Sequence, residues 1–370
     1  MKFAIDRNTL HAALQKVLGG VETKQTMQIL GNVLLDAGTD RLTITGTDLE
    51  LELVVTVEAR VEAPNRTTVN ARKLHDIVRS APRDAVIECS LEEGWLNLRI
   101  NRSRFKLATM DPQDFPQTPE PAEDARNYRL PESTLRQLID RTAMSMAQQD
   151  VRYFLNGMLI ELNRNSLRCV TTDGHRLAFS EASIDLDVDE ASQFIVPRKA
   201  ILELGRLLDE QSEQMLDVRI DRRQMQIAFS DLLFTTKLID GRYPNYERVI
   251  PSEFEVSLNL DRLALKDALT RATILSQDKF PGARFTFGED TLLIETHNND
   301  QESSREELPI DYQGAVFHVG FNIRYLLDIL NTISGETVMF HLRDSETSSL
   351  IQPTEDQRTT DRYVLMPMKL

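Results

Sequence analysis

The chain has 370 residues, 41% of them hydrophobic and 27% charged, and its formal net charge is −15. This length favours two or three domains and this composition an ordinary globular protein, while the lack of a long apolar run or a signal-peptide core argues against a membrane location. With only Cys89 and Cys169 a disulfide framework and a thiolate metal site are excluded, so we expect a cytoplasmic protein without metal or cofactor.

Six segments have the apolar spacing of amphipathic helices. In the first, Leu10, Leu14 and Val17 recur at i, i+4 and i+7 and therefore share one face. Asn70 and Asn322 stand where an N-cap residue is expected, and Pro197 where a first-turn proline is. The predicted helices cover residues 6–18, 70–80, 131–147, 197–210, 261–276 and 322–334.

Short alternating segments between these helices predict strands, and one kind of turn recurs after them. LTIT, LRCV and LLI lead into GTDLE, TTDGHR and ETHNND, so that Asp48, Asp173 and Asn298 are spaced 125 residues apart. A second set of landmarks, Phe105, Phe234 and Tyr363, is spaced 129 residues apart. Further strands are predicted at LTITGT, WLNLRI and MQIAFS.

The two spacings indicate one module repeated three times. Proline-containing segments, DFPQTPEPAED and ERVIPSEFE, interrupt the pattern and place the boundaries at residues 1–120, 121–250 and 251–370. Each module is α+β, with two helices laid on antiparallel sheet. Modules joined head to tail either close into a ring, for which two chains would supply six modules, or form an open row of three. The repeat alone leaves both arrangements open.

Charge is unevenly distributed between the predicted helices and the rest of the chain. The helical segments contain 14 Lys or Arg and ten Asp or Glu, a net charge of +4, so the remainder carries −19. If all six helices face one way, an acidic protein offers a mildly basic face to the phosphates of a duplex. The alternative is an ordinary solvated face, and no base-reading motif is present.

The chain resembles the bacterial sliding-clamp family, the beta subunits of DNA polymerase III. The resemblance runs from the first residue to the last, and its motifs are MKFAIDR, ILGNVLL, LTITGTDLE, QDVRYFLNGML, TTDGHRLA, VPRKAI, DGRYPNYERVIP, ILS followed by KF, and YVLMPMKL. It implies a head-to-tail homodimer closed into a six-domain ring, with duplex DNA passing through and no catalytic activity. The implied partners are the polymerase alpha subunit, the clamp loader, and other polymerases and repair proteins that bind through a short peptide motif.

For DNA, the family's contact positions match Lys24, Arg72, Gln149, Tyr153 and Phe154. Aromatic and amide groups on a loop can touch sugar and phosphate without reading sequence. The alternative for Tyr153 and Phe154 is packing in the core at the start of a strand. Lys24 replaces an arginine that is frequent in the family, which keeps the charge and loses the bidentate fork.

For partner proteins, the resemblance implies a cleft, and the end of the chain supports it. Met366, Met368 and Leu370 place apolar side chains at a terminus, which is normally polar, and methionine suits surfaces that receive several ligands. Glu346 departs from the apolar residue that is frequent in the family. The matching positions are Leu155, Thr172, Gly174, His175, Arg176, Leu177, Pro244, Arg248, Val249, Phe280, Asn322, Tyr325, Ser348, Val364, Met366, Pro367, Met368 and Leu370.

For the contact between two copies, the resemblance implies an apolar patch flanked by charges. Ile274 and Leu275 would meet Phe105 and Leu107 of the other copy. The acids of this contact are Glu302, Glu306 and Glu307, and the bases facing them are Lys73 and Arg104. The alternatives are a solvated acidic loop and a helix end whose apolar residues belong to the core.

A hydrolase is the competing hypothesis, because Asp173 and His175 stand together and Ser180 follows as a possible nucleophile. The commoner interpretation of Asp-Gly is a turn in which Gly174 adopts positive φ. The other two copies of this turn, Asp48-Leu49-Glu50 and Asn298-Asn299-Asp300, favour a repeated structural turn. No phosphate loop, HExxH pair or GxSxG elbow is present.

Overall fold

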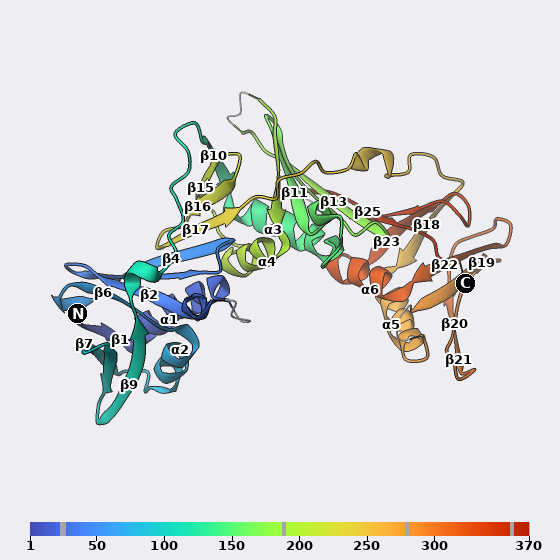
Figure 1. The fold of residues 1–370 in the computed structure, drawn as a ribbon. Helices are drawn as coiled ribbons and strands as arrows, with labels where there is room; N and C mark the ends of the chain where they lie inside the picture. The colour runs from blue at the N-terminus through green and yellow to red at the C-terminus, as the bar shows by residue number, and fades with distance from the viewer. Residues whose placement is uncertain (23–26, 187–189, 278–280, 356–358, 370) are drawn as a thin grey trace. The chain divides into compact units, whose positions relative to one another are not determined.

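The computed structural model describes residues 1–22, 27–186, 190–277, 281–355 and 359–369. It divides into two compact units, one made of residues 1–131 and 213–238 and the other of residues 132–212 and 239–370. Lys24, Phe280 and Leu370, which the sequence assigns to DNA or partner binding, lie outside the described residues. Figure 1 labels the helices and many of the strands.

The described residues contain six α-helices, all within the predicted segments. They are α1 (Arg7–Val17), α2 (Ala71–Ser80), α3 (Glu132–Thr142), α4 (Arg198–Leu207), α5 (Arg262–Thr273) and α6 (Ile323–Thr332). Asn70 and Asn322 are N-caps, since their side chains accept from the backbone N–H groups of Lys73 and Arg324 at 3.0 Å. Pro197 occupies the N-cap position, one residue before the expected first turn. The helix expected over residues 131–147 ends at Thr142 and continues as a 3₁₀ turn.

The first unit is built on one antiparallel sheet of thirteen strands. Their order is β10-β15-β16-β17-β4-β3-β2-β6-β9-β8-β7-β1-β5. The strands are β1 (Lys2–Asp6), β2 (Asn32–Ala37), β3 (Arg41–Thr47), β4 (Leu51–Glu58), β5 (Arg60–Ala63), β6 (Asn65–Asn70), β7 (Val86–Glu92), β8 (Trp95–Ile100), β9 (Ser103–Met110), β10 (Arg126–Pro131), β15 (Met215–Ile220), β16 (Gln224–Ala228) and β17 (Leu232–Lys237). The strand predicted at WLNLRI coincides with β8.

The second unit has two antiparallel sheets, of eight and four strands. Their orders are β14-β11-β12-β13-β25-β24-β23-β18 and β21-β20-β19-β22. The strands are β11 (Gly157–Asn163), β12 (Ser166–Thr172), β13 (Arg176–Ser183), β14 (Ser192–Pro197), β18 (Val256–Asp261), β19 (Gly282–Gly288), β20 (Thr291–His297), β21 (Ser303–Pro309), β22 (Phe317–Asn322), β23 (Thr337–Leu342), β24 (Ser349–Pro353) and β25 (Thr359–Leu365). Figure 1 shows α3, α4 and α6 on the same side of the eight-stranded sheet.

Sheet hydrogen bonding continues from one repeat into the next. β17 of the central repeat pairs with β4 of the first, with Phe234 opposite Leu53. β25 of the last repeat pairs with β13 of the central one, with Tyr363 opposite Ala178. The central repeat therefore contributes strands to both units, which is why the chain divides within that repeat and not at its ends.

The apolar stripes predicted from sequence form the cores. Leu10, Leu14 and Val17 of α1 are buried, and in the second unit Phe285, Phe321 and other side chains pack between α5, α6 and the sheets. Cys89 and Cys169 are free and buried, and burial raises the pKa of the Cys89 thiol to about 12. Among the described residues, no helix has the length and apolar character needed to span a membrane.

Candidate partner-binding cleft

The turn between β12 and β13 is held by its own side chains. Asp173 Oδ1 accepts from the N–H groups of His175 and Arg176 at 2.9 and 3.0 Å, and Thr172 Oγ1 accepts from that of Gly174 at 3.1 Å. Gly174 has φ +88°, as the turn interpretation requires. The backbone therefore holds His175 at an exposed position at the end of the sheet.

Side chains at the corresponding positions also close the turns of the other two repeats. Asp48 Oδ1 accepts from the N–H groups of Glu50 and Leu51 at 2.9 and 2.7 Å. Asn298 Oδ1 accepts from those of Asp300 and Glu302 at 3.0 and 2.9 Å. The turn after Asp48 therefore repeats that after Asp173, with positive φ at Leu49 and Gly174. The turn after Asn298 has the same kind of side-chain closure but is one residue longer, with positive φ at Gln301.

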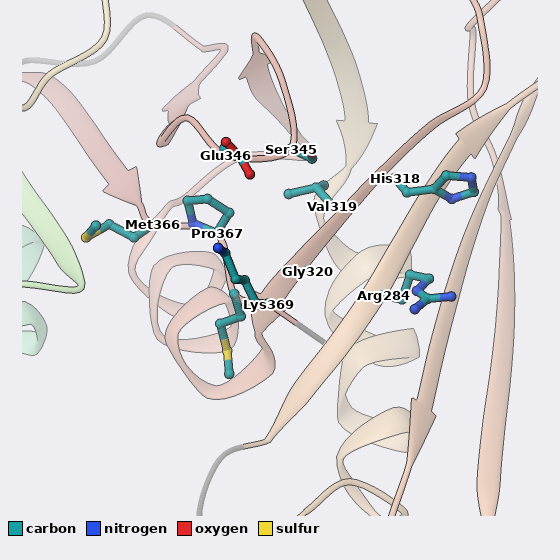
Figure 2. Close-up of a pocket in the computed structure, with 10 residues that line it drawn as sticks. Arg284, His318, Val319, Gly320, Ser345, Glu346, Met366, Pro367 and Lys369 are labelled. Atoms are coloured by element: carbon teal, nitrogen blue, oxygen red, sulfur yellow. The ribbon is translucent and has the colours of Figure 1, made fainter.

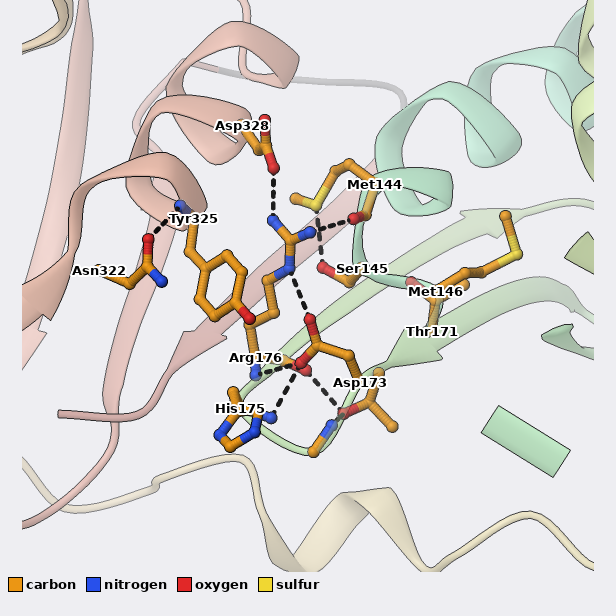
Figure 3. A network of polar contacts seen from close by, with 12 residues as sticks. Met144, Ser145, Met146, Thr171, Asp173, His175, Arg176, Asn322, Tyr325 and Asp328 are labelled. Atoms are coloured by element: carbon orange, nitrogen blue, oxygen red, sulfur yellow. Dashed lines mark hydrogen bonds and ion pairs between the residues drawn. The ribbon is translucent and has the colours of Figure 1, made fainter. Parts of the chain in front are cut away.

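Arg176 connects this turn to two other segments (Figure 3). Its guanidinium donates to Asp173 Oδ2 at 3.1 Å, to Asp328 Oδ2 of α6 at 2.6 Å and to the carbonyl of Met144 at 2.6 Å. It also lies over the ring of Tyr325, 4.2 Å from the centroid. Because its side chain is only 10% exposed, Arg176 is chiefly a positioning residue that fixes the turn against α6 and the 3₁₀ turn after α3.

The last residues of the chain are pinned beside this turn. The N–H of Met366 donates to the carbonyl of His175 at 3.0 Å, and that of Met368 donates to the carbonyl of Gly320 in β22 at 2.8 Å. Backbone hydrogen bonds at both positions hold the segment extended, so it does not fray as a free terminus would. Met366 remains 44% exposed, which leaves an apolar side chain available to a partner.

The predicted cleft residues include a buried floor and an exposed rim. Leu155, Leu177 and Val364 are buried in one apolar cluster with Tyr243 and Tyr246. The rim residues are exposed to solvent: Gly174, His175, Pro244, Arg248, Val249 and Met366. Val249 is 47% exposed. Side chains of the floor can serve a partner only as the base against which it packs.

A pocket of about 520 Å³ adjoins the terminal segment (Figure 2). Met366, Pro367 and Met368 form one wall, and Ser345 and Glu346 lie on the loop between β23 and β24. Asp344 fixes this loop by accepting from the Thr347 hydroxyl at 2.7 Å and from the N–H groups of Glu346 and Thr347 at 2.9 and 2.6 Å. These bonds, that of the hydroxyl first, lower the pKa of the Asp344 carboxyl. The sequence departure at Glu346 therefore places a carboxylate beside the methionines.

Arg284 and His318 line the same pocket, and sequence reasoning did not single them out. Both lie on exposed sheet positions of β19 and β22, with no periodic or motif signal that could have identified them. Asn322, Tyr325 and Ser348, which the resemblance assigns to the cleft, are half-buried, and Asn322 serves as the N-cap of α6.

The hydrolase hypothesis is wrong in its geometry. Ser180 is fully buried on β13 and donates its hydroxyl hydrogen bond to Asp361 Oδ1 at 2.5 Å. Asp173 is committed to the turn and to Arg176. Neither group is placed to act on a substrate with His175. No group of three or more His, Cys, Asp or Glu in the described part of the chain is arranged as a metal site.

Comparison with known proteins assigns the family. Models of the DNA polymerase III beta subunit match residues 1–119 as the N-terminal domain, 129–245 as the central domain and 247–369 as the C-terminal domain. The chain belongs to the DNA polymerase III beta-subunit family. It is thus made of three α+β domains and has the sliding-clamp function of that family. Members of the family are non-catalytic processivity subunits.

Relatives across the full length agree with this assignment. The chain is 44% identical to the beta sliding clamp of Pseudomonas putida and 42% identical to that of Escherichia coli K12, with all of each chain covered. The crystal structure of the DNA polymerase III subunit beta from Pseudomonas aeruginosa is 43% identical, covers all of both chains and superposes with a TM-score of 0.93. Another structure of the P. aeruginosa sliding clamp contains bound griselimycin, with the same identity and TM-score.

Within this family framework, the predicted DNA contacts that are described lie at the surface. Arg72 is exposed on α2, and Gln149 has φ +57° in the loop after α3. Tyr153 is 56% exposed, whereas Phe154 is half-buried against the apolar floor of the cleft. These two aromatics form a 3₁₀ turn just before β11. The packing of Phe154 agrees with the alternative of a core residue, whereas the exposed Tyr153 does not.

The residues predicted for the contact between copies lie on α2 and β9, just after α5, and on or just before β21. Phe105 and Leu107 alternate with exposed residues on β9, and Glu306 and Glu307 lie on β21. Ile274, just after α5, is 77% exposed, and Leu275 is half-buried, so Ile274 does not belong to the core of its own chain. Arg104, Lys73 and Glu302 are exposed.

Proposed function

We propose that two copies of the chain pair head to tail into a closed ring around duplex DNA and tether the replicative polymerase to it. The ring holds DNA by topology and reads no sequence. The chain acts in the cytoplasm, needs no cofactor, and is organised as domains 1–120, 121–250 and 251–370. Membership of the DNA polymerase III beta-subunit family, with a match for each of three domains, supports the clamp function in this proposal.

The observation that carries ring closure is the repeated joint between sheets. β17 with β4 and β25 with β13 make the same antiparallel edge pairing between consecutive repeats. Their counterparts at the two ends of the chain are β9 and β21. Most of β9 and all of β21 lack a pairing partner along one edge among the described residues. An unpaired edge strand is a template for another strand, and a second copy supplies it at both ends.

Side chains beside these edges suit that contact. Ile274 offers an exposed apolar group just after α5, and Phe105 and Leu107 offer two half-buried apolar groups on β9. The charges are complementary in sign, with acids on the third repeat and bases on the first. The acids are Glu302, Glu306 and Glu307, and the bases are Lys73 and Arg104.

DNA contact is proposed through the basic helices and loops. The net +4 of the helical segments, against −19 elsewhere, supports weak attraction to phosphates without braking the ring. Arg72 and Lys24 supply charge, while Gln149, Tyr153 and Phe154 supply loop contacts to the sugar-phosphate backbone.

Partner binding is proposed at the cleft beside the His175 turn. The exposed Val249 and Met366 above the buried floor of Leu155, Leu177 and Val364 suit a short peptide with apolar side chains. Such a peptide would come from the polymerase alpha subunit, the clamp loader, and other polymerases or repair proteins. Phe280 and Leu370 complete the proposed set.

Retention on DNA of different topology tests this function. The protein is loaded onto nicked circular DNA, washed at high salt, and the circle is then linearised. We expect the protein to survive the wash and to leave after linearisation, because salt screens contacts but does not open a closed ring. Equal loss from circular and linear DNA would show that the protein adheres to DNA without enclosing it.

A further inference from the structure

The two internal joints share one register. Phe234 lies opposite Leu53 in the first, and Tyr363 lies opposite Ala178 in the second. Phe234 and Tyr363 are equivalent positions of the repeat. Leu53 and Ala178 are equivalent as well. Leu53 pairs with Gly46 in the β3–β4 hairpin, and Ala178 pairs with Thr171 in the β12–β13 hairpin, in each case as the second pair after the turn. The register is thus a property of the repeat.

The corresponding residues at the ends of the chain follow from the same hairpins. Phe105 on β9 is the counterpart of Phe234 and Tyr363. Ser304 on β21, which pairs with Thr296 across the third hairpin, is the counterpart of Leu53 and Ala178. Building on the ring proposed above, we propose that β9 of one copy pairs with β21 of the other with Phe105 opposite Ser304. This register places Ser103 opposite Glu306 and Arg104 directly opposite Arg305.

The first consequence is a polar triad that only the second copy can complete. In the joint between β13 and β25, Asp361 receives the Ser180 hydroxyl at 2.5 Å and lies 3.5 Å from Arg141, the tenth residue of α3. The tenth residue of α5 is Arg271, and its Nε donates to Glu306 at 3.0 Å.

In the proposed register, Ser103 of the second copy takes the place of Ser180. In the internal joint the serine lies on β13 and the acid on β25, whereas between copies the acid, Glu306, lies on β21 and the serine, Ser103, on β9. Arg271 and Arg141 occupy the same position of their helices. Arg271 lowers the pKa of the Glu306 carboxyl, so that group is ionised and ready to accept the Ser103 hydroxyl at neutral pH.

The second consequence is a pair of like charges, Arg104 and Arg305, between the two copies. At the equivalent position of both internal joints the paired side chains attract each other. The cross-strand pair there is Leu233 with Val54 in the first joint. It is Arg362 with Phe179 in the second, where the guanidinium lies 5.4 Å from the ring centroid. Between copies it is Arg104 with Arg305, and like charges directly opposite each other destabilise a sheet.

Neighbouring strands do not remove this repulsion. Arg99 pairs with Arg104 across β8 and β9, and it is already bound to Glu88 at 3.3 Å. Glu295 pairs with Arg305 across β20 and β21 and partly compensates its charge. In the proposed register Glu307 lies opposite Arg102 and diagonal to Arg104. The joint between copies is therefore weaker than the internal joints, with a defined weak position.

Reversing one charge tests the repulsive pair. Arg305→Glu should lower the dissociation constant of the dimer in sedimentation on the order of tenfold over two joints. Raising the salt concentration should narrow the difference from the native chain. The control is Arg284→Glu, two strands away on the same face of the sheet, which should leave the dissociation constant unchanged. No tightening in Arg305→Glu, or equal tightening in the control, overturns the assignment.

Cysteine pairs test the register itself. Arg104→Cys with Arg305→Cys should cross-link two copies under mild oxidation, whereas Arg104→Cys with Ser303→Cys, two residues out of register, should not. The native Cys89 and Cys169 are buried and should not compete. Cross-linking of the offset pair alone overturns the register while leaving the dimer intact. A native chain that sediments as a monomer overturns the proposed ring as well.

A double-mutant cycle tests the triad. Ser103→Ala should raise the dissociation constant of the dimer about fivefold, and should have no effect when Glu306→Gln is already present. Additive effects of the two substitutions would separate Ser103 from Glu306 and overturn the triad.

Discussion

Replacing Arg176 by alanine should loosen the turn that carries His175. The native guanidinium makes charge-assisted hydrogen bonds to Asp173, Asp328 and the Met144 carbonyl. Hydrogen bonds to charged groups contribute about 1.5–3 kcal/mol each, but the Asp328 side chain is 44% exposed and its bond is screened by water. Allowing for this, Arg176→Ala should lower the free energy of opening the turn by about 3 kcal/mol.

Hydrogen exchange followed by mass spectrometry measures this opening directly. Peptides that cover residues 171–180 should exchange on the order of 100-fold faster in Arg176→Ala. Arg343→Ala is the matched control, because its ion pair with Glu253 at 3.3 Å is between two exposed side chains and should contribute at most about 0.5 kcal/mol. If both variants exchange at the native rate over residues 171–180, the positioning role of Arg176 is refuted.

Ile274→Glu should convert the dimer to monomers in sedimentation, because it charges an apolar group that is 77% exposed. The control Leu263→Glu, on the helix α5 that Ile274 follows and 52% exposed, should remain dimeric, and a dimeric Ile274→Glu would place the contact elsewhere. Met366→Glu should abolish binding of an apolar polymerase-derived peptide in fluorescence anisotropy. Met215→Glu, similarly exposed, should bind like the native chain, and equal affinities of both variants would remove the cleft assignment. Burial and the nearby Arg7 lower the pKa of His11 in the folded chain, so the unfolded chain binds more protons below pH 6.5. The free energy of unfolding should therefore decrease as the pH falls below 6.5, and His11 should not affect it above that pH. Urea midpoints at pH 7.5 and 5.5 measure this loss, which His11→Leu should reduce; an unchanged loss would assign it to other groups.

Local features of the fold could be predicted because their causes lie within a few residues. Asp48, Asp173 and Asn298 close their turns through bonds to N–H groups two to four residues ahead, so the pattern is complete in the sequence itself. The six helices follow likewise from apolar spacing and from caps such as Asn70 and Asn322. Helix ends were less accurate: α3 stops at Thr142 and a 3₁₀ turn follows, although its predicted segment extends to residue 147.

The candidate site could be predicted only in part. The resemblance assigned Leu155, Leu177 and Val364 to the cleft, and the structure brings them into one buried cluster. It gave no indication that Arg176 is committed to internal contacts, because its partners Met144 and Asp328 are 32 and 152 residues away in the chain. Arg284 and His318 line the adjoining pocket without any local sequence signal.

By itself, the sequence determined the threefold repetition, the helices, the hairpin turns and, through its motifs, the family. These follow from short-range periodicity and turn chemistry, whose energies depend on neighbours along the chain. Tertiary structure alone decided that Ser180 is buried against Asp361, that Met366 and Met368 are pinned by His175 and Gly320, and that sheets run on from one repeat to the next. Each of these depends on contacts between residues far apart in sequence, which become neighbours only when strands from different repeats pair.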